Sequence, residues 1–250
     1  MTYCLGIVTR HGLVMAADSR TNAGVDYIST YQKLFDFSDP GQRVILLCSA
    51  GNLSITQSVL NVLEQDLRLR ESENLHTMAT MYDVARYVGN KIRYIQQQER
   101  NWLEKDGIDF KCTLLLGGQI RGESPALYMI YSQGNFIQAT TETPFLQIGE
   151  TKYGKPILDR TLGFNTALED AAKVALLSLD STMKSNISVG PPIDLVLYEA
   201  HSFFIKHQVR LRSGDPYLEK MRRLWESSLR EAFERMPNVD WKQYEARDER

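Results

Sequence analysis

Three residues near the start of the chain have the types that amide hydrolysis requires: Thr2, Asp18 and Lys33. Thr2 follows Met1 directly, and a small second residue permits removal of Met1, which leaves a threonine with a free α-amine. Such an amine lies within reach of its own hydroxyl and can act as its base. Because the pKa of an α-amine is about 7.7–8.0, a modest lowering makes it a proton acceptor near neutral pH.

The elements around these residues are predicted to bring them together. Apolar runs at 3–9 and 13–17 flank His11-Gly12, which is typical of a tight β-hairpin. In such a hairpin Thr2 and Asp18 become neighbours, and Lys33, which opens the apolar run 33–37, can reach the same corner. A buried lysine would stabilise a threonine alkoxide, and Asp18 would keep that lysine charged. Taken alone, Thr2 would be an ordinary residue of an edge strand; the surrounding pattern favours a nucleophile.

This N-terminal block resembles the start of a proteasome β-subunit. The resemblance spans Thr2 to about residue 210 and is carried by Thr2, the hairpin, Val14-Met-Ala-Ala-Asp18-Ser-Arg20, Ala23-Gly24, Lys33, Cys48-Ser-Ala-Gly51, Ile148-Gly149 and Ser188-Val-Gly190. Within the family, the chain is most similar to the bacterial proteasome-type proteases called Anbu, or ancestral β-subunits. Its length and its charged C-terminal helix support this narrower match.

The resemblance implies a threonine-type peptidase that hydrolyses peptides or unfolded proteins within a homo-oligomer, either a closed ring or an open spiral. It implies catalytic roles for Thr2, Asp18, Lys33, Gly51 and Ser188. Gly51 resembles the glycine whose backbone N–H binds the oxyanion, although a turn alone would also require glycine there. Ser188 is expected to hydrogen-bond the amine of Thr2 and to help lower its pKa.

The sequence departs from the family pattern at three places. Glu150 stands where the family has a serine, and Ser185 stands where it has an aspartate. The segment from Asp18 to Lys33 is one residue shorter, which a deletion in the intervening loop would absorb. Glu150, Ser185 and Arg20 are expected to support the site, Arg20 by pairing with a carboxylate. The departures leave two alternatives open: a weak or inactive proteasome-like scaffold subunit, and an amidase that uses the same nucleophile on a non-peptide or isopeptide amide.

Apolar periodicity predicts the order strands, two helices, strands, two helices, two strands and one helix. The further strands are expected at 33–37, 43–49, 112–117, 126–131, 136–139, 145–148, 193–198 and 203–209, the helices at 52–70, 77–103, 151–161, 166–183 and 216–235, and a loop at 19–31. This order suits an α+β domain. The resemblance implies a four-layer αββα sandwich of two mostly antiparallel sheets with an extended C-terminal helix. We expect a single domain over 1–250, with a core at 2–210, the C-terminal helix at 214–236 and a frayed, charged tail at 240–250.

Composition limits the compartment and the partners. The 250-residue chain is 43% hydrophobic with a net charge of −2, which gives no indication of nucleic-acid binding. Cys4, Cys48 and Cys112 lie in apolar runs and are expected to be buried thiols, as in a cytoplasmic protein. We expect no membrane span and no signal peptide. The four histidines lack metal-ligand spacing, so we expect no metal or cofactor. No phosphate-binding loop occurs, so any ATP-dependent delivery of substrate is expected to need a separate partner.

Overall fold

The computed structural model describes residues 1–22 and 28–245. It divides into two units, Met1–Ser213 and Gly214–Arg250, which are described separately.

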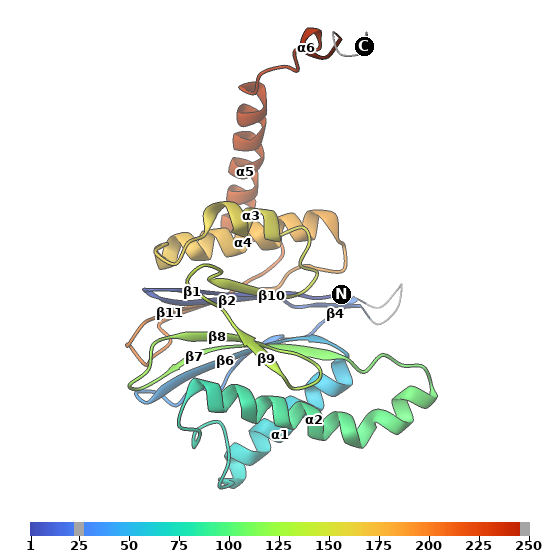
Figure 1. The fold of residues 1–250 in the computed structure, drawn as a ribbon, viewed down its shortest axis with the longest axis vertical. Coiled ribbons are helices and arrows are strands. Elements are labelled where there is room, and N and C mark those ends of the chain that lie inside the picture. Colours follow the sequence, from blue (N-terminus) through green and yellow to red (C-terminus); the bar gives the residue numbers. More distant parts are fainter. Residues whose placement is uncertain (23–27, 246–250) are drawn as a thin grey trace. The chain divides into compact units, whose positions relative to one another are not determined.

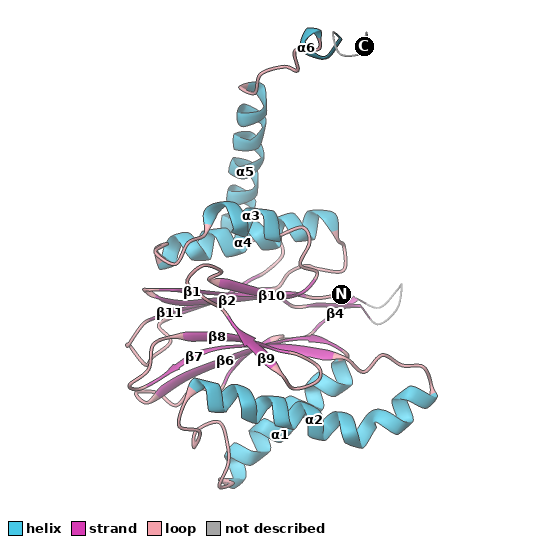
Figure 2. Ribbon diagram, viewed as in Figure 1, coloured by secondary structure: helices cyan, strands magenta, loops and turns pink. Residues whose placement is uncertain are grey.

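Two five-stranded antiparallel sheets form the centre of the first unit (Figures 1 and 2). The first sheet has the order β10 (Phe145–Gly149), β1 (Tyr3–Thr9), β2 (Gly12–Asp18), β11 (Ile193–Glu199) and β12 (His207–Leu211). The second has the order β5 (Leu34–Asp36), β6 (Arg43–Gly51), β7 (Cys112–Ile120), β8 (Ala126–Ile130) and β9 (Phe136–Gln138).

Helices cover the outer face of each sheet. Figure 1 shows α1 (Leu53–Leu69) and α2 (Met81–Lys105) against the second sheet, and α3 (Lys155–Thr161) and α4 (Leu168–Ser185) against the first. The four layers are therefore helix, sheet, sheet and helix, which confirms the predicted αββα sandwich.

Alternation along the strands gives the molecule two apolar layers. On β6, Val44, Leu46 and Cys48 face the first sheet and pack with Cys4 and Met15. The intervening residues of β6 face the other way and pack with residues of α1 and α2, among them Ile45, Leu47, Ile55, Val59, Val88 and Ile92. Because side chains alternate along a strand, one strand can fill both layers. The three cysteines are free and buried, as predicted.

The first hairpin turns one residue earlier than predicted. Thr9 pairs with Gly12, so the two-residue loop is Arg10-His11 and Gly12 already belongs to β2. Gly12 has a φ of +143°, and a β-carbon there would collide with the carbonyl of Tyr198 on β11. The glycine thus permits the close approach of β11 rather than forming the turn itself.

Other boundaries also differ from the prediction, and α2 and α3 each begin four residues later than predicted. The expected loop at 19–31 contains two short paired strands, β3 (Arg20–Asn22) and β4 (Ile28–Thr30); residues 23–27 lie outside the described part. The strand predicted from 203 begins only at His207; at its predicted first residue, Phe203, the φ is +56°, which a strand does not accommodate. Part of the predicted frayed tail is helical.

The second unit consists of α5 (Pro216–Glu234) and α6 (Lys242–Glu245). Asp215 caps α5, because its Oδ1 accepts hydrogen bonds from the N–H groups of Tyr217 and Leu218. Residues 246–250 of the predicted tail lie outside the described part. Across residues 1–22 and 28–245, the longest apolar stretches of helix fall short of what crossing a membrane requires.

Candidate active site

A buried ion pair joins the two sheets near the N-terminus. Asp18 is the last residue of β2 and Lys33 directly precedes β5, and Nζ of Lys33 lies 2.8 Å from Oδ1 of Asp18. Their exposed fractions are only 4% for Lys33 and 0% for Asp18. Lys33 therefore reaches the predicted corner despite the shorter intervening segment, and its Nζ also donates to the carbonyl of Arg20 at 2.6 Å.

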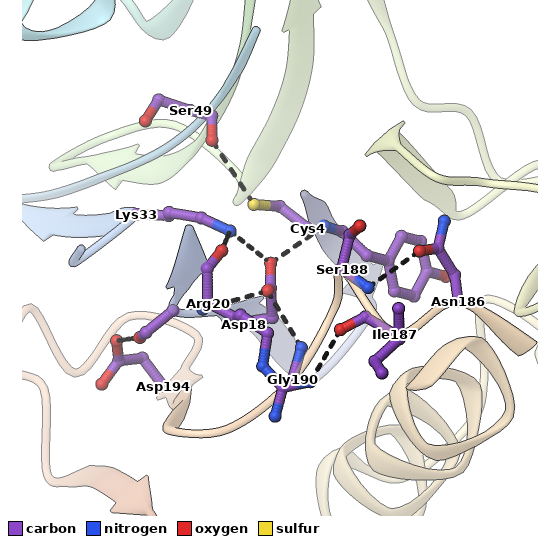
Figure 3. Close-up of polar contacts among 12 residues, drawn as sticks. Cys4, Asp18, Arg20, Lys33, Ser49, Asn186, Ile187, Ser188, Gly190 and Asp194 are labelled. Atoms are coloured by element: carbon purple, nitrogen blue, oxygen red, sulfur yellow. Dashed lines mark hydrogen bonds and ion pairs between the residues drawn. The ribbon is translucent and has the colours of Figure 1, made fainter. Parts of the chain in front are cut away.

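Asp18 is surrounded by hydrogen-bond donors (Figure 3). Besides Lys33, its Oδ1 accepts from the backbone N–H of Tyr3 at 2.9 Å, and its Oδ2 accepts from the N–H groups of Arg20 and Gly190 at 3.2 Å each. Burial raises the pKa of Asp18, while the charge of Lys33 and the hydrogen bonds act to lower it. Because a buried carboxylate is costly unless it is paired, this arrangement requires both the lysine and the backbone donors.

The backbone of Thr2 is held on both sides of its peptide bond to Tyr3. The carbonyl of Thr2 accepts a hydrogen bond from the N–H of Glu150 at 2.7 Å, and the next N–H, that of Tyr3, donates to Asp18. Gly149 has a φ of +84°, and a β-carbon there would overlap the Thr2 carbonyl. Only glycine permits so close an approach of β10 to the nucleophile candidate.

Thr2, Lys33 and Gly51 line one cavity of about 200 Å³, which we call the nucleophile cavity. Its other lining residues include Thr21, Tyr31, Ser49 and Thr56. The structure therefore brings together three of the five predicted catalytic residues around one hollow, with Asp18 directly behind Lys33.

Strand register fixes the direction of the Gly51 N–H. The N–H of Asn52 donates to the carbonyl of Lys111, the residue before β7, and the N–H of Ser49 donates to the carbonyl of Lys33 on the opposite side. Because N–H groups alternate in direction along a strand, the N–H of Gly51 points as that of Ser49 does, beyond the start of β5. That is the side on which the nucleophile cavity lies. Gly51 also has a φ of +112° and no room for a β-carbon beside Lys111, so its turn requires glycine as well.

Ser188, Glu150 and Ser185, which were predicted to act at the site, are not among the residues that line the nucleophile cavity. Ser188 is half-buried, and its backbone N–H donates to Asn186 Oδ1 at 3.0 Å; within the described residues it makes no hydrogen bond to Thr2. Nδ2 of Asn186 donates to Glu150 Oε2 at 3.1 Å, so Asn186 links Glu150 with the Ser188 turn. Ser185, the last residue of α4, is exposed.

Arg20 differs from its prediction. One of its guanidinium nitrogens, Nη1, donates to the carbonyl of Ile187 at 2.7 Å, so in the described chain it braces a backbone segment rather than pairing with a carboxylate. The guanidinium also packs over Gly190, where a β-carbon would collide with it. The bracing holds the turn whose Gly190 N–H binds Asp18.

Sequence reasoning missed two polar networks behind the site. Ser19 donates to Asp194 Oδ2 at 3.1 Å, and Arg210 binds both oxygens of Asp194 at 2.7 and 2.8 Å. The only sequence signal was a charged residue at an inward position of an apolar strand.

The second network surrounds the hydroxyl of Tyr3, which lies 2.6 Å from that of Ser178 on α4 and accepts from the amide of Gln147 on β10. Burial raises the pKa of Tyr3 to about 12, so the hydroxyl stays protonated. No sequence signal pointed to this network, because it joins residues far apart in the chain.

Comparison with known proteins gives consistent results. The family model described as proteasome subunit matches residues 2–197. The solved structure of Anbu (ancestral beta-subunit) from Yersinia bercovieri is 44% identical, covers 95% of this chain and 98% of that one, and superposes with a TM-score of 0.90. The structure titled helical assembly of the Anbu complex from Pseudomonas aeruginosa is 46% identical, with the same coverages and the same TM-score. Proteasome subunit beta 2 of Pyrobaculum calidifontis is 25% identical over 202 residues, 78% of this chain and 87% of the relative.

Proposed function

Because this chain belongs to the proteasome subunit family, we propose that it is a threonine-type peptidase whose nucleophile is Thr2 after removal of Met1. Family membership and the sandwich fold support a hydrolase of the N-terminal-nucleophile type in general. Fold alone does not establish an activity, so the proposal depends on the site. The observation that carries it is the cavity lined by Thr2, the buried Lys33 and Gly51.

The reaction follows from these positions. The free amine of Thr2 takes the hydroxyl proton, directly or through a water, as Oγ attacks the carbonyl carbon of the substrate. Lys33, kept charged by Asp18, stabilises the developing alkoxide. The N–H of Gly51 donates to the oxyanion of the tetrahedral intermediate.

The second half of the reaction regenerates the enzyme. The protonated amine of Thr2 gives its proton to the leaving amine, and an acyl ester on Oγ remains. A water, deprotonated by the same amine, then attacks the ester and releases the carboxylic acid and the threonine hydroxyl. No metal or cofactor takes part in this scheme.

We propose further that the chain works within a homo-oligomer. The structure from Pseudomonas aeruginosa is described as a helical assembly, and it matches 95% of this chain at 46% identity. Assembly would confine hydrolysis to an enclosed or semi-enclosed surface and so limit the substrates to peptides and unfolded segments.

Glu150 and the Ser188 turn motivate one alternative, an amidase that uses the same Thr2 on a non-peptide or isopeptide amide. The backbone N–H of Glu150 donates to the carbonyl of Thr2, and its carboxylate accepts from Asn186, which also accepts the N–H of Ser188. The negative charge of Glu150 would favour the protonated amine of Thr2, so a smaller fraction of the amine would be the free base at neutral pH.

Hydrolysis by the wild type, Thr2→Ala and Thr2→Ser proteins tests the proposal. We expect cleavage of a fluorogenic peptide library by the wild type, partial activity for Thr2→Ser, which keeps a hydroxyl nucleophile, and none above background for Thr2→Ala. Cleavage of small amides without cleavage of any peptide would favour the amidase. Equal peptide cleavage by wild type and Thr2→Ala would contradict both.

A further inference from the structure

A cavity of about 750 Å³ lies beside the end of α2, outside the site described above. Three basic residues, Arg93, Arg100 and Lys111, line it, and we call it the basic pocket. Phe110 supplies an apolar wall, and Gln96 and Ser132, which are buried and hydrogen-bonded to each other, lie at its base.

The charges of the basic pocket favour an anion. Its one carboxylate is that of Asp109, whose Oδ1 accepts from the backbone N–H of Lys111 at 3.0 Å. Arg93 is anchored, because its Nη1 donates to the carbonyl of Gln133 at 3.1 Å. Arg100 lies over the ring of Phe110 at 5.5 Å, and its contact with the exposed Glu104 is long, at 3.9 Å.

Lys111 is the one cation of the basic pocket that also lines a cavity with Gly51. Its side chain is exposed, and its ammonium pairs with none of the carboxylates in the part of the chain that the structure describes. An unpaired ammonium and a loosely held guanidinium in one hollow can accept a carboxylate without first breaking a strong pair. Arg100 and Lys111 are therefore available to bind a carboxylate in the basic pocket.

Shared lining residues relate the basic pocket to the nucleophile cavity through a third cavity. A third cavity of about 400 Å³ shares Ala50 and Gly51 with the nucleophile cavity and shares Asp109 and Lys111 with the basic pocket. Strand pairing explains why Gly51 and Lys111 line the same cavity. β6 pairs with β7 so that Gly51 lies opposite Cys112, the residue after Lys111. Gly149 also lines this third cavity, next to the carbonyl of Thr2.

We propose that the basic pocket is a specificity subsite that binds a carboxylate of an extended peptide substrate whose scissile bond lies at Thr2. The inference rests on the proposed function and names a substrate class for it: peptides with an acidic group at a fixed distance to one side of the cleaved bond. An extended peptide advances about 3.3 Å per residue, so a side chain several residues away can follow the three hollows to Arg100 and Lys111. The carboxylate belongs either to Asp or Glu or to the C-terminus of the peptide.

Peptide binding to the Thr2→Ala protein tests the proposal without requiring hydrolysis. The probes are fluorescein-labelled peptide amides of one length, with a single Glu or Gln moved through every position, and binding is followed by anisotropy. We expect Glu to bind about fivefold more tightly than Gln at one position, as two solvated ion pairs would give, and the advantage to shrink at high salt. The same peptides with a free C-terminal carboxylate show whether the terminus can replace the acidic side chain.

Two matched pairs of substitutions identify the pocket. Arg100→Gln with Lys111→Gln should abolish the advantage of Glu, whereas Arg68→Gln with Arg86→Gln, which removes two exposed charges outside the pocket lining, should leave it intact. The same gain at every peptide position, or equal losses in both double variants, would show general attraction and overturn the subsite.

Sedimentation tests whether the basic pocket instead contacts a second copy of this chain. If the pocket variant changes the oligomeric state while the Glu preference persists, the basic pocket belongs to a subunit contact and the proposal is wrong. Peptide binding by Thr2→Ala does not depend on hydrolysis. If the wild type failed to cleave peptides, the proposed function would be wrong, but the binding experiment would still test the subsite.

Discussion

Nζ of Lys33 and Oδ1 of Asp18 lie 2.8 Å apart at the corner where the two sheets of the sandwich meet. The same Oδ1 accepts the N–H of Tyr3, the residue after the proposed nucleophile. One buried carboxylate thus positions both the backbone of Thr2 and the ammonium that shares its cavity. Stability and chemistry are therefore coupled at Asp18.

Lys33→Met should destabilise the fold as well as abolish hydrolysis. The substitution keeps the length of the side chain but leaves Asp18 buried without its cation, and breaking a buried pair costs about 3–5 kcal/mol. Chemical denaturation measures the loss. Lys155→Met is the matched control. It removes an exposed ion pair, in which Nζ of Lys155 lies 2.6 Å from Oδ1 of Asp159, and should lower the free energy of unfolding by less than about 1 kcal/mol. Equal losses for the two variants would contradict a structural role for the buried pair.

The raised pKa of Asp18 predicts a pH dependence of stability with a definite sign. Burial raises the pKa of the folded carboxyl above that of the unfolded chain, so between the ordinary value of about 4 and the raised value the folded state binds more protons. The contribution of Asp18 to stability therefore falls as pH rises through that window. Other carboxyls mask this trend, so the measurement is the difference in unfolding free energy between wild type and Asp18→Asn as a function of pH. A difference that rises with pH would contradict the shift.

Gly149→Ala should remove activity without touching a charged group. A β-carbon at this position would overlap the carbonyl of Thr2, and the φ of +84° strains any other residue. We expect a loss of about 1–3 kcal/mol in unfolding free energy and at least a hundredfold loss in kcat/KM. Gly163→Ala is the control, because Gly163 has nothing within 4 Å of the added carbon; it should be neutral in both assays.

Glu150→Gln tests the carboxylate of the residue whose backbone N–H binds the carbonyl of Thr2. A nearby negative charge favours the protonated amine, so its removal should lower the pKa of the amine and move the acidic limb of the pH–rate profile to lower pH. The exposed Glu142→Gln serves as the control for net charge. An unshifted profile in Glu150→Gln would mean that the carboxylate, held by Asn186, has no influence on the base.

The sequence predicted the sandwich because its apolar periodicities are strong and its family resemblance is broad. It also predicted that Asp18 and Lys33 would meet, because a hairpin end and a strand start can share a corner. It misplaced the hairpin turn, since the need for Gly12 comes from the passing strand β11 and not from local turn chemistry.

The supporting contacts could not be predicted, because they depend on pairs distant in sequence. Ser188 is near the site but bonded through its N–H to Asn186, and Arg20 braces the carbonyl of Ile187 rather than a carboxylate. The direction of the Gly51 N–H follows from strand register, which sequence patterns do not specify to one residue.

Intact mass after incubation with a peptide epoxyketone tests the central claim most directly, because this probe reacts with both the hydroxyl and the free amine of an N-terminal threonine. For the wild type, we predict loss of Met1 and one probe adduct, and for Thr2→Ala no adduct. Wild-type protein that retains Met1 and stays unmodified would contradict Thr2 as the nucleophile and favour a scaffold subunit.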